Sequence, residues 1–398
     1  AVSAGLTPGA ETATVAPRTP GAIAPAEGIE ALDRLLAVDV DSMTVTLEPG
    51  VRGPRAEELL AEHGLTLGHF PQSFEYASIG GFAVTRSSGQ SSAGYGRFDS
   101  LVVGLRVATP RGELVLGSSP ANAAGPDLRE VVMGSEGAFG VVTAVTVRVR
   151  RIPEVKVYET WRFDSFHDGV GAMRTLAQAQ LLPTVLRLSD EAETAVNLAK
   201  PAEVGGDTGG GCLMVTGYEG TPAAVAARRD ACTALLPGLG ATAMGEDAQW
   251  ASGRFHGPYL RDSLLDVGVL VETLETVTFW SRLDRVYTAV KEALTASLGE
   301  STLVLCHVSH VYETGASLYF TVATKQSDDP VGQWLAAKAA ASDALVDNGA
   351  SITHHHAIGQ DHKPWLAREI GPVGVRMLRA LKEELDPAGV LNPGVLIP

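Results

Sequence analysis

The chain has 398 residues, of which 45% are hydrophobic and 19% charged, so it can bury a sizeable core and is too long for one domain of average size. Its 46 acidic residues outnumber 31 basic ones and give a formal net charge of −15, which argues against nucleic acid as a partner. Apolar runs such as residues 267–271 have the length of strands and fall short of a membrane span.

The N-terminal region and the cysteines indicate the cellular setting. Residues 1–30 are rich in alanine, threonine, proline and glycine, so we expect little regular structure there, and they lack the basic and apolar parts of a signal peptide. The three cysteines, at 212, 232 and 306, are odd in number, far apart and outside any CxxC pattern. This spacing favours a reducing compartment, and we expect the cytoplasm.

The first part of the chain is typical of a mixed domain. Residues 43–47 alternate like a strand, and residues 54–64 read as a helix with proline at its start and glycine at its end. A glycine- and serine-rich loop at 80–96 precedes a predicted hairpin, formed by residues 101–108 and 114–116, and then a strand at 141–149. The pattern breaks at residues 150–154, which predicts a first domain over residues 1–152.

The second part alternates helices with strands. Helices are predicted at residues 168–180, 222–236, 280–298 and 332–346, and strands at 184–188, 212–218, 302–311 and 317–323. The short polar link at 313–315 suits an antiparallel hairpin. Helices beside an antiparallel sheet define an α+β second domain over residues 153–350. The last segment, 351–398, carries one further predicted helix at 364–385, which Pro387 ends.

Two loops rich in small residues could hold a cofactor. Residues 80–96 and 134–140 combine glycine, which lets the backbone approach a ligand closely, with serine hydroxyls. Such loops suit a flat, polar ligand that bears phosphates. An exposed flexible loop is the alternative for either segment alone, and two such loops in one domain favour a cofactor site.

Three consecutive histidines are the second chemical feature. If the backbone at His354, His355 and His356 is extended, the first and third rings share one side. They could transfer protons, grip an anion or bind a metal. We predict no metal, because no Asp, Glu or Cys nearby has the usual ligand spacing, and a structural role for the three rings is the alternative.

Three further side chains stand out on predicted strands and helices. Tyr319 lies within the strand at 317–323 on the same face as Ser317 and Thr321, where a core role is the default for a tyrosine. Arg187 stands between two leucines on a short apolar strand, so it needs a carboxylate or an anionic ligand as partner. Arg261 has Asp262 beside it, which is typical of a surface ion pair.

Several motifs resemble the flavin-binding domain of the vanillyl-alcohol-oxidase/p-cresol-methylhydroxylase superfamily. They are residues 69–81, 85–89 and 133–140. More narrowly, the order and spacing of later segments are similar to the alkylglycerone-phosphate synthase family, at residues 185–190, 259–262, 312–320 and 352–359. The resemblance extends from about residue 40 to the end. It implies a truncated FAD-binding domain of the PCMH type, an antiparallel-sheet-and-helices substrate (cap) domain, and a C-terminal segment that returns to the flavin side.

The resemblance also implies roles for individual residues. FAD would be the cofactor, bound by Gln72, Ser73, Glu75, Ser78, Thr85, Arg86, Ser87, Ser88, Glu136, Gly137, Ala138, Gly140 and Val142. Tyr319 would be the acid/base tyrosine, and His354, His355 and His356 the essential histidines. Arg187, Arg261 and His69 would contact the substrate.

The family reaction exchanges the acyl chain of acyl-dihydroxyacetone phosphate for a fatty alcohol without net redox change, with the flavin as a covalent handle. The implied partners are therefore a small lipid phosphate and a fatty alcohol, and a peripheral membrane contact and a homodimer are compatible with them. An FAD-linked oxidase or dehydrogenase of a hydroxy acid or alcohol is the second hypothesis. A flavin-free remnant that acts as a binding protein is the third.

One departure from the superfamily pattern concerns the N-terminus. The superfamily has a small α/β lobe and a glycine-rich loop that wraps the FAD pyrophosphate, whereas residues 1–6 resemble only the tail of that loop. Residues 8–30 also lack the apolar strand expected there. Either the sequence is a fragment of a longer protein, which we favour, or the chain has lost strong flavin binding.

Overall fold

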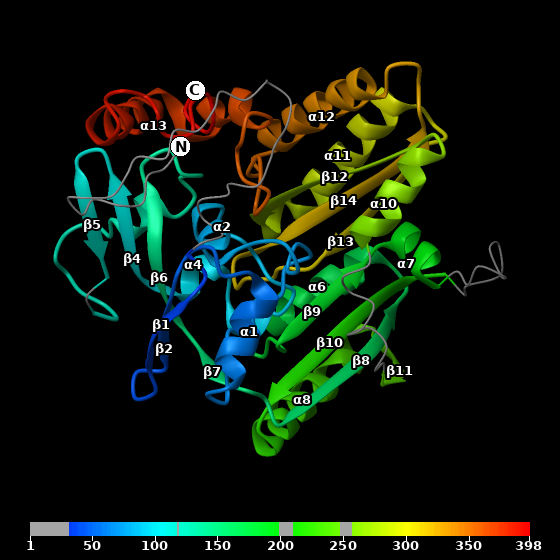
Figure 1. Cartoon of the computed structure of the whole chain (residues 1–398). Coiled ribbons are helices and arrows are strands. Elements are labelled where there is room, and N and C mark those ends of the chain that lie inside the picture. Colours follow the sequence, from blue (N-terminus) through cyan, green and yellow to red (C-terminus); the bar gives the residue numbers. More distant parts are fainter. Residues whose placement is uncertain (1–31, 118, 199–209, 247–256) are drawn as a thin grey trace.

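A computed structural model describes residues 32–117, 119–198, 210–246 and 257–398. The expectation for residues 1–30 lies outside the described residues. Figure 1 shows two sheets side by side, with the five-stranded sheet of the first part on the left and the seven-stranded sheet of the second part on the right. No helix of the described residues is long and apolar enough to cross a membrane.

The first sheet has the strand order β1-β2-β6-β4-β5, with antiparallel neighbours. Its core contains Val45, Leu105 and Val145 from the strands and Phe82 from the helix α2. The elements of this part are β1 (Leu35–Asp39), β2 (Thr44–Leu47), α1 (Gly53–Ala61), β3 (Leu65–Thr66), α2 (Ile79–Val84), α3 (Ser92–Tyr95), α4 (Phe98–Leu101), β4 (Val102–Thr109), β5 (Gly112–Leu116), α5 (Arg129–Val132), β6 (Val141–Arg148) and β7 (Arg150–Arg151).

The second sheet has the order β11-β8-β10-β9-β13-β14-β12, and all its neighbours are antiparallel. Helices α6, α8, α11 and α12 contribute to the core on one face of it. The elements are β8 (Val155–Phe163), α6 (Phe166–Gln178), β9 (Val185–Ser189), α7 (Glu191–Leu198), β10 (Cys212–Gly220), α8 (Pro222–Leu235), η1 (Leu236–Leu239), β11 (Thr242–Glu246), α10 (Gly257–Asp266), β12 (Val269–Phe279), η2 (Trp280–Arg282), α11 (Leu283–Leu298), β13 (Leu303–Val308), β14 (Gly315–Lys325), α12 (Pro330–Asp347) and α13 (Lys363–Leu385).

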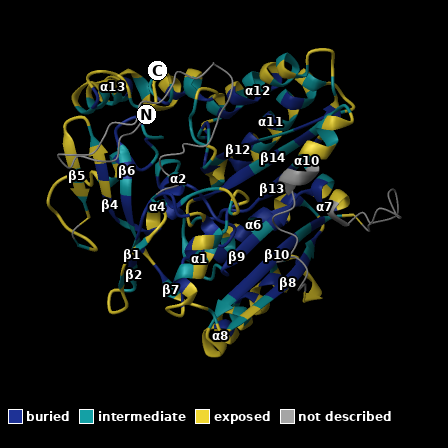
Figure 2. Ribbon diagram, viewed as in Figure 1, coloured by how far each residue is buried: buried dark blue, intermediate teal, exposed yellow. Residues whose placement is uncertain are grey.

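Strand alternation decides which side chains of the second sheet face the helices. On β14, Leu318, Phe320 and Val322 belong to the buried core. Since side chains on a strand alternate, Ser317 and Tyr319 point to the opposite face. Figure 2 shows the central strands as largely buried, which agrees with a sheet covered on both sides. The α+β prediction is therefore confirmed.

The chain's last segment packs against the first part of the molecule. Leu366 and Leu396 form a small core with Ala138 and Phe139. The Glu136 carboxylate accepts hydrogen bonds from the backbone N–H groups of residues 358 and 359, each at 2.8 Å. In Figure 1 the helix α13 accordingly lies above the first sheet.

Three predicted elements differ from the observed ones. The segment 80–96 is not all loop, because the apolar residues 79–84 form α2 and pack into the first core. The predicted helix at 364–385 is broken at Gly371, which has a non-helical φ of 70°. The next residue, Pro372, has no backbone N–H to donate to a helical hydrogen bond. The strand predicted at 302–311 ends at Val308, and residues 309–314 lead into the turn before β14.

Candidate active site

A cavity of about 900 Å³ lies between the two parts of the molecule. Residues 71–90 form one wall, which includes the predicted cofactor contacts Gln72, Ser73, Glu75, Ser78, Thr85, Ser87 and Ser88. The opposite wall comes from the second sheet and from the histidine segment, with Arg187, His307, His310, Tyr319, His355 and His356. The fold thus brings predicted catalytic and cofactor-binding side chains to one hollow.

Strand register explains why the second wall is polar. His307 on β13 pairs with Ser189 on β9 and with Tyr319 on β14, and Tyr319 pairs in turn with Glu275 on β12. Directly opposed residues of antiparallel strands point to the same face, so these four side chains form a row across the sheet. The opposite face of the same strands is apolar and covered by helices, and two members of the row, His307 and Tyr319, line the cavity.

Arg187 is held by a buried carboxylate. Its Nη2 donates to Glu193 Oε1 at 2.8 Å, and the same oxygen lies 3.0 Å from His307 Nδ1. Burial acts to raise the pKa of Glu193, but its interactions with His307 and Arg187 lower that pKa to about 2. Glu193 is therefore ionised at neutral pH and orients both cavity residues.

Tyr319 is packed among imidazole rings. It stacks on His307 with 4.8 Å between ring centroids and meets His356 edge-on at 5.5 Å. Burial raises the pKa of the Tyr319 hydroxyl, so this hydroxyl is protonated at neutral pH.

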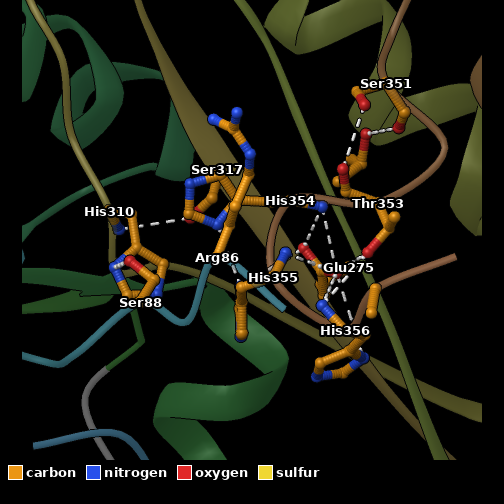
Figure 3. A network of polar contacts seen from close by, with 12 residues as sticks. Arg86, Ser88, Glu275, His310, Ser317, Ser351, Thr353, His354, His355 and His356 are labelled. Carbon is orange, nitrogen blue, oxygen red and sulfur yellow. Dashed lines mark hydrogen bonds and ion pairs between the residues drawn. The ribbon is translucent and has the colours of Figure 1, made fainter. Parts of the chain in front are cut away.

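The histidine segment is curled rather than extended, so the condition under which the rings of His354 and His356 would share one side is not met. The backbone N–H groups of all three histidines donate to the carboxylate of Glu275, at distances from 2.8 to 3.1 Å. Thr353 Oγ1 donates to the same carboxylate. Figure 3 shows these bonds converging on Glu275. Four donors on one acceptor bend the backbone, and this bend puts His355 and His356 at the cavity.

His354 has a different environment from its two neighbours. Its ring is buried, its Nε2 lies 2.5 Å from the Tyr312 hydroxyl, and its Nδ1 lies 2.9 Å from His355 Nδ1. Burial holds the pKa of His354 well below its usual value, which keeps this imidazole neutral at neutral pH. His354 therefore supports the site from behind the cavity wall.

Three imidazoles are close enough to share a metal ion. His310, His354 and His355 each offer a nitrogen within 4.8 Å of the other two. In the structure, however, His310 Nδ1 contacts the hydroxyls of Ser88 and Ser92, at 3.0 and 2.7 Å, while the Nδ1 atoms of His354 and His355 contact each other. The absence of a metal stays a prediction.

Several predicted site residues lie outside the cavity wall. His69 is buried between Phe82 and Phe98, and its Nε2 lies 3.0 Å from Ser87 Oγ, so it supports the wall from behind. Arg86 fastens neighbouring loops through Asp99, Glu130 and the Met133 carbonyl. Arg261 pairs with Asp262 and Glu272. Glu136, Gly137, Ala138, Gly140 and Val142 also lie outside the wall.

Glu193, Glu275, His307 and His310 contribute to the site but were not among the predicted residues. What holds for Arg187, that a buried charge needs a partner, holds for the two glutamates as well. Each is a charged residue that must be paired if it is buried, and Glu275 stands between Leu274 and Thr276 on a mostly apolar strand. Their partners are distant in sequence and so cannot be read from local spacing.

Two family models match the chain. Residues 29–117 match a family described as "FAD binding domain", and residues 152–396 match "FAD linked oxidases, C-terminal domain". The second match covers more than half of the chain, and the chain belongs to this family of FAD-linked enzymes.

Known relatives narrow the similarity further. An alkyldihydroxyacetonephosphate synthase of Trypanosoma brucei brucei is 33% identical over 394 residues, which are 92% of this chain and 64% of the relative. The chain therefore spans less than two thirds of that relative's length. A solved alkyldihydroxyacetonephosphate synthase structure is 30% identical with a TM-score of 0.77, over 92% of this chain and 67% of that chain. A solved p-cresol methylhydroxylase, 16% identical with a TM-score of 0.69 over 92% of this chain and 78% of that chain, shares the fold.

The cavity fits an FAD cofactor. Its volume is within the range of about 300 to 1,000 Å³ that small-molecule and cofactor sites occupy. The wall at residues 71–90 offers hydroxyl and amide groups, which can bond to the polar edge of a flavin ring. Gly89 lets this wall fold closely, because a Cβ there would lie 2.8 Å from the Phe70 backbone nitrogen. The cavity therefore suits the cofactor of the FAD-linked family to which the chain belongs.

Proposed function

We propose that this chain exchanges the acyl chain of acyl-dihydroxyacetone phosphate for a fatty alcohol and so forms an ether lipid. The proposal rests mainly on one observation: Arg187, Tyr319, His355 and His356 line the same cavity, opposite a wall suited to a flavin. A guanidinium, a phenol and imidazoles are the groups that a phosphate ester and a proton-transfer reaction require. The similarity to alkyldihydroxyacetonephosphate synthases supports the same reaction.

The wall at residues 71–90 would hold the cofactor. Gln72, Ser73, Ser87 and Ser88 would bond to its polar groups. When bound, FAD would supply an electrophilic ring for the exchange.

The protein's own side chains would bind the substrate and move protons. The Arg187 guanidinium would hold the phosphate. It has several N–H donors, so it can bond to a phosphate while it stays paired with Glu193. Tyr319 would hydrogen-bond the ester oxygen as the bond from that oxygen to the dihydroxyacetone carbon breaks and the carboxylate leaves. A cavity imidazole would take the hydroxyl proton of the fatty alcohol as its oxygen bonds to the same carbon. No electrons are gained or lost overall.

The test is a comparison of two assays on protein incubated with FAD. Incorporation of a radiolabelled fatty alcohol into the ether product, without bleaching of an electron-acceptor dye, supports the proposal. Bleaching of the dye with a hydroxy acid, and no incorporation, supports an FAD-linked oxidase, which the family match to FAD-linked oxidases also favours. Protein that stays colourless after incubation with FAD would instead support the flavin-free binding protein.

We also propose that the chain works in the cytoplasm and meets its lipid substrates at a membrane surface. Its three cysteines are buried free thiols, which suits a reducing compartment. Fractionation of the expressing cells, followed by vesicle flotation of the purified protein, tests both points. Recovery from an oxidising compartment, or no binding to vesicles, would contradict them.

A further inference from the structure

Glu275 links the histidine segment to the sheet. Its side chain is fully buried, it lies in register with Tyr319, and it accepts the three consecutive backbone N–H groups of His354, His355 and His356. Its Oε2 also lies 3.4 Å from His355 Nδ1, whereas the corresponding distance from His356 Nδ1 to Oε1 is 4.0 Å. The carboxylate therefore meets both the backbone and one ring of this segment.

The contacts of the His355 ring restrict where its proton can sit. The Nδ1 atoms of His354 and His355 are 2.9 Å apart, and a hydrogen bond between two neutral imidazoles needs one donor and one acceptor. A hydrogen on His355 Nδ1 would face both the Glu275 carboxylate and His354 Nδ1. The opposite arrangement would turn a lone pair of His355 Nδ1 toward the anion, which is unfavourable.

The partner of His354 is consistent with this arrangement. His354 Nε2 lies 2.5 Å from the Tyr312 hydroxyl, whose oxygen can accept a hydrogen from that nitrogen. With hydrogen on its Nε2, a neutral His354 has an unprotonated Nδ1, which is the acceptor that His355 Nδ1–H requires. Every contact from Tyr312 through His354 to His355 then has one donor and one acceptor, and the Glu275 carboxylate near His355 Nδ1 favours this direction over the reverse one.

We propose that Glu275 is a positioning residue that holds His355 in the tautomer with hydrogen on Nδ1. Nε2 is then the nitrogen of His355 that can take a proton from a group in the cavity. A buried carboxylate that fixes an imidazole in this way is known to matter for catalysis, since replacing such an aspartate by asparagine in a serine protease lowers kcat by about 10⁴ through the wrong tautomer. Glu275 itself does not line the cavity and acts through His355.

The direct test is the tautomer of His355, measured by NMR on protein labelled with ¹⁵N-histidine and loaded with FAD. His355→Asn identifies the resonance by its loss. In the wild type, the two-bond couplings should show hydrogen on Nδ1, whereas Glu275→Gln, which has nearly the same shape and no charge, should show hydrogen on Nε2. Hydrogen on Nε2 in the wild type, or an unchanged tautomer in Glu275→Gln, overturns the proposal. If Glu275→Gln does not fold, the wild-type spectrum alone decides.

A matched control is Glu369→Gln. Glu369 accepts the backbone N–H of Ile352 at 2.8 Å and the Ser351 hydroxyl at 2.8 Å, so it anchors the same segment. Among the described residues, Glu369 makes no hydrogen bond or ion pair with an imidazole ring, so its replacement should leave the His355 tautomer unchanged. A tautomer change in this variant would show that segment anchoring in general, and not the Glu275 charge, sets the proton, which overturns the proposal.

A kinetic readout rests on the proposed function. Glu275→Gln should lower kcat for alcohol exchange by at least about 100-fold, with KM changed less than about threefold, because substrate contacts remain while the base is lost. A rise in KM with unchanged kcat would overturn the positioning role. Since the NMR measurement needs no turnover, failure of the proposed reaction is distinguishable from failure of this inference.

Discussion

Replacing Tyr319 by phenylalanine removes one oxygen atom and leaves the packing of the ring in place. The ring keeps its stack on His307, at 4.8 Å, and its edge contact with His356, at 5.5 Å. Its strand pairs with β12 and β13 through backbone bonds, which the substitution does not touch. The change therefore isolates the hydroxyl.

The expected effect on the reaction is large. Burial raises the pKa of Tyr319, so the wild-type hydroxyl is protonated at neutral pH and can donate a hydrogen bond. Loss of a positioned acid or base typically costs about 10²- to 10⁴-fold in rate, or about 3 to 5 kcal/mol of transition-state stabilisation. The free energy of unfolding should fall by no more than about 1.5 kcal/mol, the usual contribution of one hydrogen bond.

The assay compares kcat for exchange, bound FAD per chain from flavin absorbance, and the urea unfolding curve. Tyr158→Phe is the matched control, because the Tyr158 hydroxyl donates to Glu219 at 2.6 Å outside the cavity wall, and its loss should leave kcat unchanged. A kcat for Tyr319→Phe within about threefold of the wild type, with FAD still bound, would refute the proton-donor role.

Three further substitutions test neighbouring parts of the account. Arg187→Lys keeps the positive charge but loses the planar guanidinium, which can bond to Glu193 and a phosphate at the same time. The KM for the acyl donor should therefore rise at least about tenfold. An unchanged KM in initial-rate assays contradicts the phosphate role. Burial lowers the pKa of His69 from 6.5 to about 3, so the unfolded chain binds a proton that the folded chain excludes as pH falls below 6.5. Between about pH 7 and pH 5, the free energy of unfolding of His69→Gln should therefore fall by about 2 kcal/mol less than that of the wild type. Equal falls in the two proteins, measured by urea unfolding at each pH, would contradict this. Glu136→Ala removes two hydrogen bonds from backbone N–H groups to a carboxylate, and it should lower the free energy of unfolding by about 3 kcal/mol. Unchanged stability with lost FAD affinity would instead support the predicted cofactor role.

The local sequence pattern was sufficient to predict which face of a strand each side chain occupies. Alternation placed Tyr319 beside Ser317, and the apolar neighbours of Arg187 indicated that it needs an anionic partner; the structure supplies Glu193. These features depend on residues close in sequence, where side-chain direction follows from the period of the strand.

The histidine segment could not be predicted in the same way. Glu275 and the histidines that it bends are separated by 79 to 81 residues, and only the folded sheet brings them together. Read alone, three consecutive histidines fit an extended strand as well as a turn. The same limit applies to His69, whose burial behind Ser87 depends on Phe82 and Phe98 packing over it.

The most direct test of the central claim follows the oxygen of the alcohol. If the cavity groups let a fatty alcohol displace the acyl carboxylate, then alcohol labelled with ¹⁸O should give an ether that keeps the label, and the released fatty acid should contain none. Mass spectrometry of both products from FAD-loaded protein measures this. An unlabelled product, or reduction of an added electron acceptor in place of ether formation, would contradict the account.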